Sequence, residues 1–235
     1  MSAPAPVAPD RATPLLVADG LSRRFGDRWA VAGVNVRLAG GRSLLLAGHN
    51  GAGKTTLLHL LAGLLRPTAG TRALGASPAG RPARVGLLGH RGQHWLDLGA
   101  LDHLRVDARL LGRRYVRADA EALLARVGLE GRGREPVRQF SAGMQKRLAL
   151  ARLLHLDPDV ALFDEPYGKL DGDGVALMDG VLAELVAAGK AVVVASHLVE
   201  HVAVRLDAGL LLDRGEMRWV GAAADLPAAL AEARR

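Results

Sequence analysis

The chain has 235 residues, 49% of them hydrophobic, which is enough for one large domain with a substantial core. It contains no cysteine, which excludes disulfides, thiolate metal sites and cysteine nucleophiles. The net charge of +7 would suit a nucleic-acid-binding protein. However, the basic residues are mostly scattered arginines, and the aromatic content is only 3%. We therefore expect an arginine-rich solvated surface, or a face toward acidic lipids, and no nucleic-acid partner.

Residues 1–14 carry four prolines among alanines, a composition typical of a disordered tail. The folded domain is expected to cover 15–235. Its first elements are two paired strands over 15–21 and 31–38, with a turn at Gly26 and Asp27. No segment resembles a signal peptide, and the longest apolar runs have the length of a strand rather than that of a membrane span.

The segment 48–56, GHNGAGKTT, matches the P-loop pattern G-x-x-x-x-G-K-[ST] at every fixed position. It follows a strand-like run over 43–47 and precedes an amphipathic helical pattern over 55–63. Glycines let backbone N–H groups surround a phosphate chain, Lys54 reaches the β- and γ-phosphates, and the Thr55 hydroxyl binds Mg²⁺, so the segment predicts a nucleoside triphosphate site. The residues expected to contact the nucleotide here are Gly48, His49, Asn50, Gly51, Ala52, Gly53, Lys54, Thr55 and Thr56.

The rest of the chain alternates between strand and helix patterns. Proline and glycine interrupt the region after the first helix, and a short strand is expected over 84–88. This order predicts an α/β fold: a parallel P-loop core with an antiparallel β edge and an inserted helical subdomain near residues 90–155. Helices are expected over 101–111, 118–127, 141–154, 175–188 and at the C-terminal end, and further strands over 160–163, 191–195, 208–212 and 217–220.

An apolar run over 160–163 ends in two carboxylates, Asp164 and Glu165. We expect Asp164, at the end of a buried strand, to hold Mg²⁺ through water, and Glu165 to accept a proton from an attacking water. Two neighbouring carboxylates alone are often a solvated turn. Behind a P-loop and an apolar strand, they indicate a hydrolytic site.

Together these segments resemble the ATP-binding subunit of an ABC transporter, over nearly the whole of the expected domain. The run FSAGMQKR at 140–147 is similar to the signature segment of that family, usually Leu-Ser-Gly-Gly-Gln. Ser141 and Gly143 are kept, whereas Phe140, Ala142 and Met144 differ. In the family this surface completes the ATP site of the opposing subunit at the γ-phosphate. The resemblance therefore implies a dimer, of like or unlike subunits, in which Ser141 and Gly143 contact the partner's nucleotide.

Three further residues stand at positions that have roles in this family. His197, after the strand at 191–195, resembles the switch histidine that contacts the γ-phosphate. Asp171 fits the D-loop, although the serine usual there is missing. Phe25 stands where the family places an aromatic ring on adenine, although a phenylalanine is more often simply packed. His197 and His201 also share a helical spacing that suits zinc, but no third ligand stands at a suitable spacing.

The strand that enters the helical insert ends in Gly89 and His90, where the family has a glutamine that contacts Mg²⁺ or the attacking water. The register of the following leucines places His90 at that position, with Gln93 as the alternative. A Gly-His pair here resembles the ATP-binding subunits of the haem exporter used in cytochrome c maturation. The resemblance thus implies that His90 is a catalytic residue and a metal ligand beside Thr55 and Asp164.

As a whole, the resemblance implies an ATP- and Mg²⁺-dependent ATPase with Glu165, His197 and His90 as catalytic residues. It would power a separate integral-membrane subunit from the cytoplasmic face of the cell membrane, as a peripheral protein. One alternative is a soluble ABC ATPase acting on nucleic acid or the ribosome, but the stretch from Lys54 to Ser141 is too short for a long coiled coil. The other is a regulatory ATP-binding half of a heterodimer. The transported substrate and its direction stay open.

Overall fold

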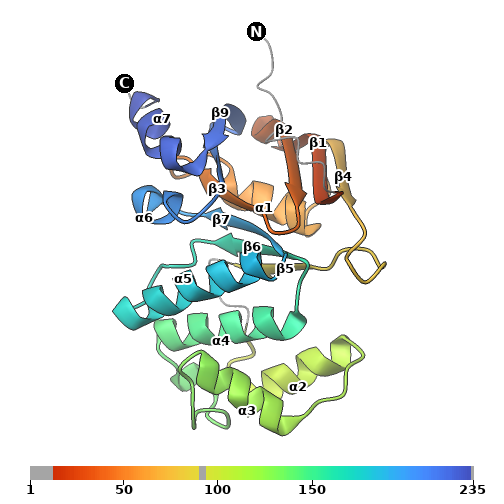
Figure 1. Cartoon of the computed structure of the whole chain (residues 1–235), viewed down its shortest axis with the longest axis vertical. Coiled ribbons are helices and arrows are strands. Elements are labelled where there is room, and N and C mark those ends of the chain that lie inside the picture. The colour runs from red at the N-terminus through yellow and green to blue at the C-terminus, as the bar shows by residue number, and fades with distance from the viewer. Residues whose placement is uncertain (1–12, 90–93, 234–235) are drawn as a thin grey trace.

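The computed structural model describes residues 13–89 and 94–233, and in these parts the chain forms one mixed β-sheet with helices packed on it (Figure 1). The expected tail, apart from its last two residues, and both His90 and Gln93 lie outside the described residues. The described strands follow the order β4-β1-β2-β9-β8-β3-β7-β6-β5 across the sheet. They are β1 (Pro14–Phe25), β2 (Arg28–Ala39), β3 (Ser43–Ala47), β4 (Ala69–Leu74), β5 (Val85–Leu88), β6 (Val160–Asp164), β7 (Ala191–Ala195), β8 (Ala208–Asp213) and β9 (Glu216–Ala222).

The sheet has a parallel and an antiparallel part. Strands β5, β6, β7, β3 and β8 pair in parallel, whereas β1 pairs antiparallel with β2 and β4. Strand β9 joins the two parts, since it pairs antiparallel with β8 and touches β2 at one parallel pair, Ala32 with Glu216. The predicted parallel core and antiparallel edge are both confirmed.

Helices cover both faces of the central strands. Leu44 and Leu46 of β3 point into one apolar cluster, with α1. Leu45 between them points into a second cluster, with α4 and α5. Strands buried on both faces are continuously apolar, which is why their sequence predicted them. The helices are α1 (Lys54–Ala62), α2 (Ala100–Leu110), α3 (Arg117–Arg126), α4 (Ala142–Leu156), α5 (Gly172–Ala187), α6 (Val199–Ala203) and α7 (Leu226–Glu232), with short 3-10 turns at Val137–Gln139 and Ala223–Asp225.

Two elements were not predicted. The region after α1 was expected to be broken by glycine and proline, but residues 69–74 form β4. This edge strand is mostly exposed, so its sequence has no apolar alternation, and its pairing with β1 holds it in place. Helix α6 has only five residues, too few for a helical period to appear.

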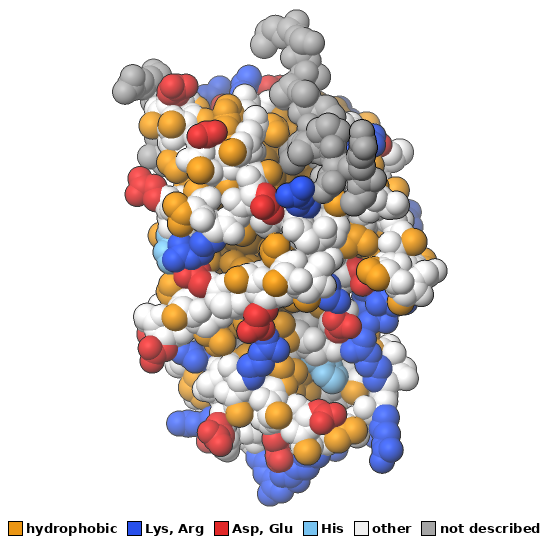
Figure 2. Space-filling model, in the orientation of Figure 1, with side chains coloured by type: hydrophobic (Ala, Val, Ile, Leu, Met, Phe, Trp, Pro, Cys, Tyr) orange, Lys and Arg blue, Asp and Glu red, His pale blue; other side chains and the backbone are white. Residues whose placement is uncertain are grey.

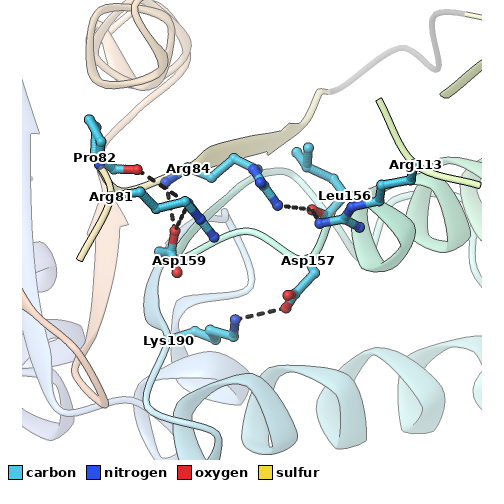
Figure 3. A network of polar contacts seen from close by, with 8 residues as sticks. All are labelled: Arg81, Pro82, Arg84, Arg113, Leu156, Asp157, Asp159 and Lys190. Atoms are coloured by element: carbon cyan, nitrogen blue, oxygen red, sulfur yellow. Dashed lines mark hydrogen bonds and ion pairs between the residues drawn. The ribbon is translucent and has the colours of Figure 1, made fainter. Parts of the chain in front are cut away.

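The helical insert joins the core at the end of α4, through the polar network drawn in Figure 3. Arg113, which follows α2, donates to the carbonyls of His155 (2.8 Å) and Leu156 (3.3 Å). Arg84, just before β5, also donates to the Leu156 carbonyl, at 3.3 Å. The last carbonyls of a helix have no partner inside it, so these guanidinium groups satisfy them. Beside them, the buried carboxylate of Asp159 accepts from the Arg84 N–H at 2.7 Å.

Charged side chains of both signs are interspersed over the face drawn in Figure 2. Two of the described ion pairs are short-range pairs within a helix, Arg117 with Glu121 at 2.8 Å and Arg105 with Asp102 at 2.7 Å. Exposed pairs of this kind contribute about 0–1 kcal/mol each, so they decide solubility more than stability.

Candidate active site

The loop between β3 and α1 has two glycines at positions with no room for a side chain. Gly53 has φ of +109°, and a Cβ there would lie 2.2 Å from the Ala30 carbonyl oxygen. A Cβ on Gly48 would lie 2.4 Å from the Leu212 carbonyl oxygen. Because no side chain caps α1, the N–H groups of its first turn remain available to an anion, which the helix dipole also favours. The loop thus has the backbone that a phosphate chain needs.

Lys54 lies folded over this loop. Its ammonium donates to the Gly48 carbonyl at 2.8 Å and to the His49 carbonyl at 3.3 Å. Burial lowers the pKa of Lys54, while the charges of Glu165 and Asp164 act in the opposite direction. The ammonium is therefore held at the loop's centre, between its carbonyls and two carboxylates.

The oxygens of Thr55 and Asp164 meet although the residues are far apart in sequence. Asp164 is 2% exposed at the end of β6, and its Oδ2 accepts from the Thr55 hydroxyl at 2.9 Å. Hard oxygen donors of this kind suit Mg²⁺, which usually takes one or two carboxylates besides phosphate and water. The described residues contain no cluster of three or more His, Cys, Asp or Glu that could hold a metal by itself, so this pair fits Mg²⁺ better than it fits a metal held wholly by protein.

Glu165 and His197 form a second pair at the ends of β6 and β7. The imidazole Nδ1 lies 2.7 Å from Glu165 Oε2, and the His197 N–H donates to the same oxygen at 3.3 Å. Glu165 has φ of +49°, a left-handed conformation that is uncommon outside glycine. Its N–H donates to the Ala195 carbonyl at 2.8 Å, which ties the turn to β7.

A cavity of about 510 Å³ lies over the loop, between the β1–β2 hairpin and the two carboxylates. It brings together several predicted residues from distant segments. Arg28 and Ala30 of the hairpin also line it and were not predicted. Their signal was their closeness in sequence to Phe25, but only the folded hairpin brings them to the loop. The lining residues are Phe25, Arg28, Ala30, Asn50, Gly51, Gly53, Lys54, Thr55, Thr56, Asp164 and Glu165.

The predicted signature segment lies apart from this cavity. The exposed Ser141 caps α4, with its Oγ accepting from the Met144 N–H at 3.2 Å. Asp171 likewise caps α5, accepts from the Gly174 N–H at 2.9 Å and pairs with Arg147. Among the described residues that line the cavity, none belongs to 140–147 or is Asp171.

Three predicted loop residues also lie outside the lining of the cavity. Gly48 contributes its carbonyl to Lys54, and Ala52 is buried. The His49 imidazole turns outward to Asp213, 2.8 Å away.

The two histidines considered for zinc have different carboxylate partners. His197 contacts Glu165, whereas His201 contacts Asp179 at 3.1 Å. They therefore do not converge on one point.

A second, larger hollow of about 910 Å³ lies between α1, β5, α2 and α4. Gly89 and His94, which flank the segment outside the described residues, both line it. Its rim includes the exposed apolar side chains of Leu64 and Leu110.

Comparison with known proteins agrees with these features. The model of the ABC transporter family matches residues 31–168. A daunorubicin resistance ATP-binding protein of Streptomyces coeruleorubidus is 37% identical over 220 residues, which are 91% of this chain and 70% of that protein. A cytochrome c biogenesis ATP-binding export protein of Methylococcus capsulatus is 40% identical over 188 residues, 77% of this chain and 90% of that protein. A solved ATP-binding subunit of an ABC transporter aligns with a TM-score of 0.82 at 22% identity, covering 92% of this chain and 93% of its own. The chain belongs to the ABC transporter family, as an ATP-binding subunit that hydrolyses ATP.

Proposed function

We propose that the cavity over the P-loop binds MgATP and that Glu165 is the general base of its hydrolysis. The observation that carries this proposal is the meeting of three groups at one edge of the sheet: Lys54 in the loop, the Thr55–Asp164 pair, and the Glu165–His197 pair. A carboxylate held by a histidine beside a phosphate site suits the removal of a proton from water.

In this proposal each side chain has one task. Lys54 offsets charge on the β- and γ-phosphates, and Thr55 and Asp164 hold Mg²⁺, which would neutralise charge developing on the phosphates. His197 orients the Glu165 carboxylate and contacts the γ-phosphate. Glu165 takes the proton of the attacking water. His90, outside the described residues, is proposed to contact the same water or Mg²⁺, with Gln93 as the alternative.

The adenine is proposed to stack on Phe25, which lines the cavity with half of its surface exposed. The Arg23 guanidinium lies over this ring, 4.7 Å from its centre. The opposite face is the one that we assign to the base.

Ser141, Gly143 and Asp171 are proposed to contact the nucleotide of a second subunit. They lie outside this chain's own cavity, and Ser141 and Asp171 are exposed, as residues of a dimer interface would be in a single subunit. Two subunits would then enclose two ATP molecules between a P-loop from one and a signature segment from the other.

We propose that this dimer lies at the cytoplasmic face of the membrane and binds a separate membrane-spanning subunit there. Within 13–89 and 94–233, no helix is both long and apolar enough to cross a bilayer. The hollow between α1, β5, α2 and α4 supports the proposal, because its rim carries exposed leucines and its lining includes Gly89 and His94, which flank in sequence the segment that links ATP to the membrane subunit in this family.

We propose that the transporter is of the haem-exporter type used in cytochrome c maturation. Two features support it: the Gly89–His90 pair and the 40% identity to a cytochrome c biogenesis export protein. Drug export is the second candidate, since the daunorubicin resistance protein aligns with a larger share of this chain.

Co-purification with a multi-spanning membrane protein from the source cell tests the proposed membrane partner. The phenotype of cells that lack the chain distinguishes the two substrate candidates. The associated protein should stimulate ATP hydrolysis, and loss of the chain should abolish c-type cytochromes in the first case. Normal cytochromes together with increased drug sensitivity would instead favour the second candidate. Co-purification with ribosomes or nucleic acid would contradict both.

A further inference from the structure

One face of α4 contacts the turn that carries Glu165. Gly143, Lys146 and Arg147 lie three and four residues apart, so they share one side of the helix. A Cβ on Gly143 would lie 3.1 Å from the Lys169 carbonyl oxygen, and Arg147 pairs with Asp171 at 2.9 Å. The helix that begins with the signature segment is thus packed along the turn 165–171.

The third of these residues is a buried lysine. Lys146 is 8% exposed, and its ammonium donates to the backbone carbonyl of Glu165 at 3.1 Å. A buried ammonium is costly unless it is paired, and here the nearby charges of Asp164 and Glu165 favour the charged form. Burial, the largest influence, lowers the pKa of Lys146.

The contact falls on an unusual peptide. Left-handed backbone at a residue other than glycine is strained and persists only where the surroundings fix it. At Glu165 the N–H donates to the Ala195 carbonyl at 2.8 Å, and the carbonyl accepts from the Lys146 ammonium at 3.1 Å and from the Gly168 N–H at 3.4 Å. Lys146 makes the shorter of the two contacts to this carbonyl and is the one that comes from outside the turn, so it helps to set the direction in which the Glu165 carboxylate leaves the backbone toward His197.

We propose that Lys146 is a positioning residue for hydrolysis, which holds Glu165 in the orientation that removes a proton from water. This inference rests on the proposed role of Glu165 as the base. It also makes α4 a rigid link: its first turn faces the nucleotide proposed to lie in the partner subunit, and its second turn holds the base of its own subunit.

The test uses the full chain with two substitutions at this position. Lys146→Met keeps length and removes the donor, so kcat should fall at least about tenfold, since a misplacement near 1 Å can cost about 100-fold. KM and the calorimetric affinity for MgATP should stay unchanged, because Lys146 is not among the residues that line the cavity over the P-loop. Lys146→Arg restores a donor and should recover most of kcat. Lys190→Met is the matched control, because its ammonium pairs at 2.7 Å with Asp157 on a different surface.

A double mutant separates positioning from general destabilisation. If Lys146 acts through Glu165, adding Lys146→Met to Glu165→Gln should cost almost nothing further in kcat. Should Lys146→Met fold poorly, Lys146→Leu, which also lacks a donor, takes its place with the same expected fall in kcat, and melting temperatures are compared with the control.

The outcomes keep this inference distinct from the proposed function. Loss of turnover in Glu165→Gln with unchanged kcat in Lys146→Met would overturn the role of Lys146 and leave the base assigned. Additive losses in the double mutant would also overturn it. Normal turnover in Glu165→Gln would instead refute the assignment of the base itself.

Discussion

The starts of α1 and α4 are both helix N-termini proposed to face phosphate, yet they are built differently. The first is capped by Gly53 in a left-handed conformation without a side-chain bond, and its loop presses against the hairpin backbone. The second is capped by Ser141, whose hydroxyl already accepts from the Met144 N–H, and it lies exposed outside the cavity. The comparison teaches that the phosphate site proposed at α1 can be formed within one chain, whereas the one proposed at α4 needs a surface from another subunit.

The largest effect should come from Lys54→Ala. If the P-loop is complete within one chain, removing its ammonium should abolish MgATP binding, because no other cation of the loop offsets the β- and γ-phosphates. Isothermal calorimetry measures this directly, with Lys190→Ala as the control for loss of a lysine. Tight MgATP binding by Lys54→Ala would contradict the proposal that the start of α1 is the phosphate site.

Glu165→Gln should separate binding from chemistry at the same site. The amide cannot accept the proton, and loss of a positioned base typically lowers the rate by about 10²–10⁴-fold. Binding should persist, and because hydrolysis is expected to release the two subunits of the proposed dimer, an ATP-bound dimer should accumulate in sedimentation. Turnover within a few-fold of the wild type would exclude Glu165 as the base.

Ser141→Arg tests the other helix. Its bulk should block closure of the dimer while leaving nucleotide binding by each single chain unchanged, since Ser141 does not line the chain's own cavity. Sedimentation of the Glu165→Gln variant with and without Ser141→Arg measures ATP-dependent dimerisation. Calorimetry measures nucleotide binding. Unchanged dimerisation would reduce the signature segment to an ordinary capped helix.

The smallest expected effect concerns pH and the helical insert. His94 Nε2 contacts the Gln145 carbonyl of α4 at 2.9 Å, and burial lowers the pKa of His94 to about 4. Between pH ~6.5 and ~4, His94 binds a proton in the unfolded chain but not in the folded one. The contribution of neutral His94 to the free energy of unfolding is therefore fully present above this window and is lost as the pH falls through it. Urea unfolding at pH 7.5 and 5 measures the loss, which His94→Gln should reduce. His59→Gln, on α1, is the control and should keep it.

Much of the fold follows from local pattern. The buried strands β3, β6 and β7 are continuously apolar, and the P-loop, the two carboxylates and His197 follow their ends in sequence. The order β3-β7-β6, and with it the pairing of Thr55 with Asp164 and of Glu165 with His197, was found only in the structure.

Other features depend on tertiary contacts that leave no local signal. Strand β4 forms because it pairs with the edge of β1. Arg28 lines the cavity because the folded β1–β2 hairpin lies beside the P-loop. Lys146 falls in a helical pattern where a lysine is expected to be solvated, so its burial against Glu165 could not be predicted from the sequence.

The guanidinium groups at the end of α4 also explain part of the excess of arginine. Lysine fills only four of the 31 basic positions. The Arg113 fork reaches two carbonyls at once, and Arg72 similarly donates to the Leu61 carbonyl in the last turn of α1. A lysine ammonium can also donate to two carbonyls, as Lys54 does, but it lacks the rigid planar fork of arginine. We therefore expect an exchange of arginine for lysine to cost more at these helix ends than on the exposed outer faces of the helices, so part of the arginine content follows from the architecture.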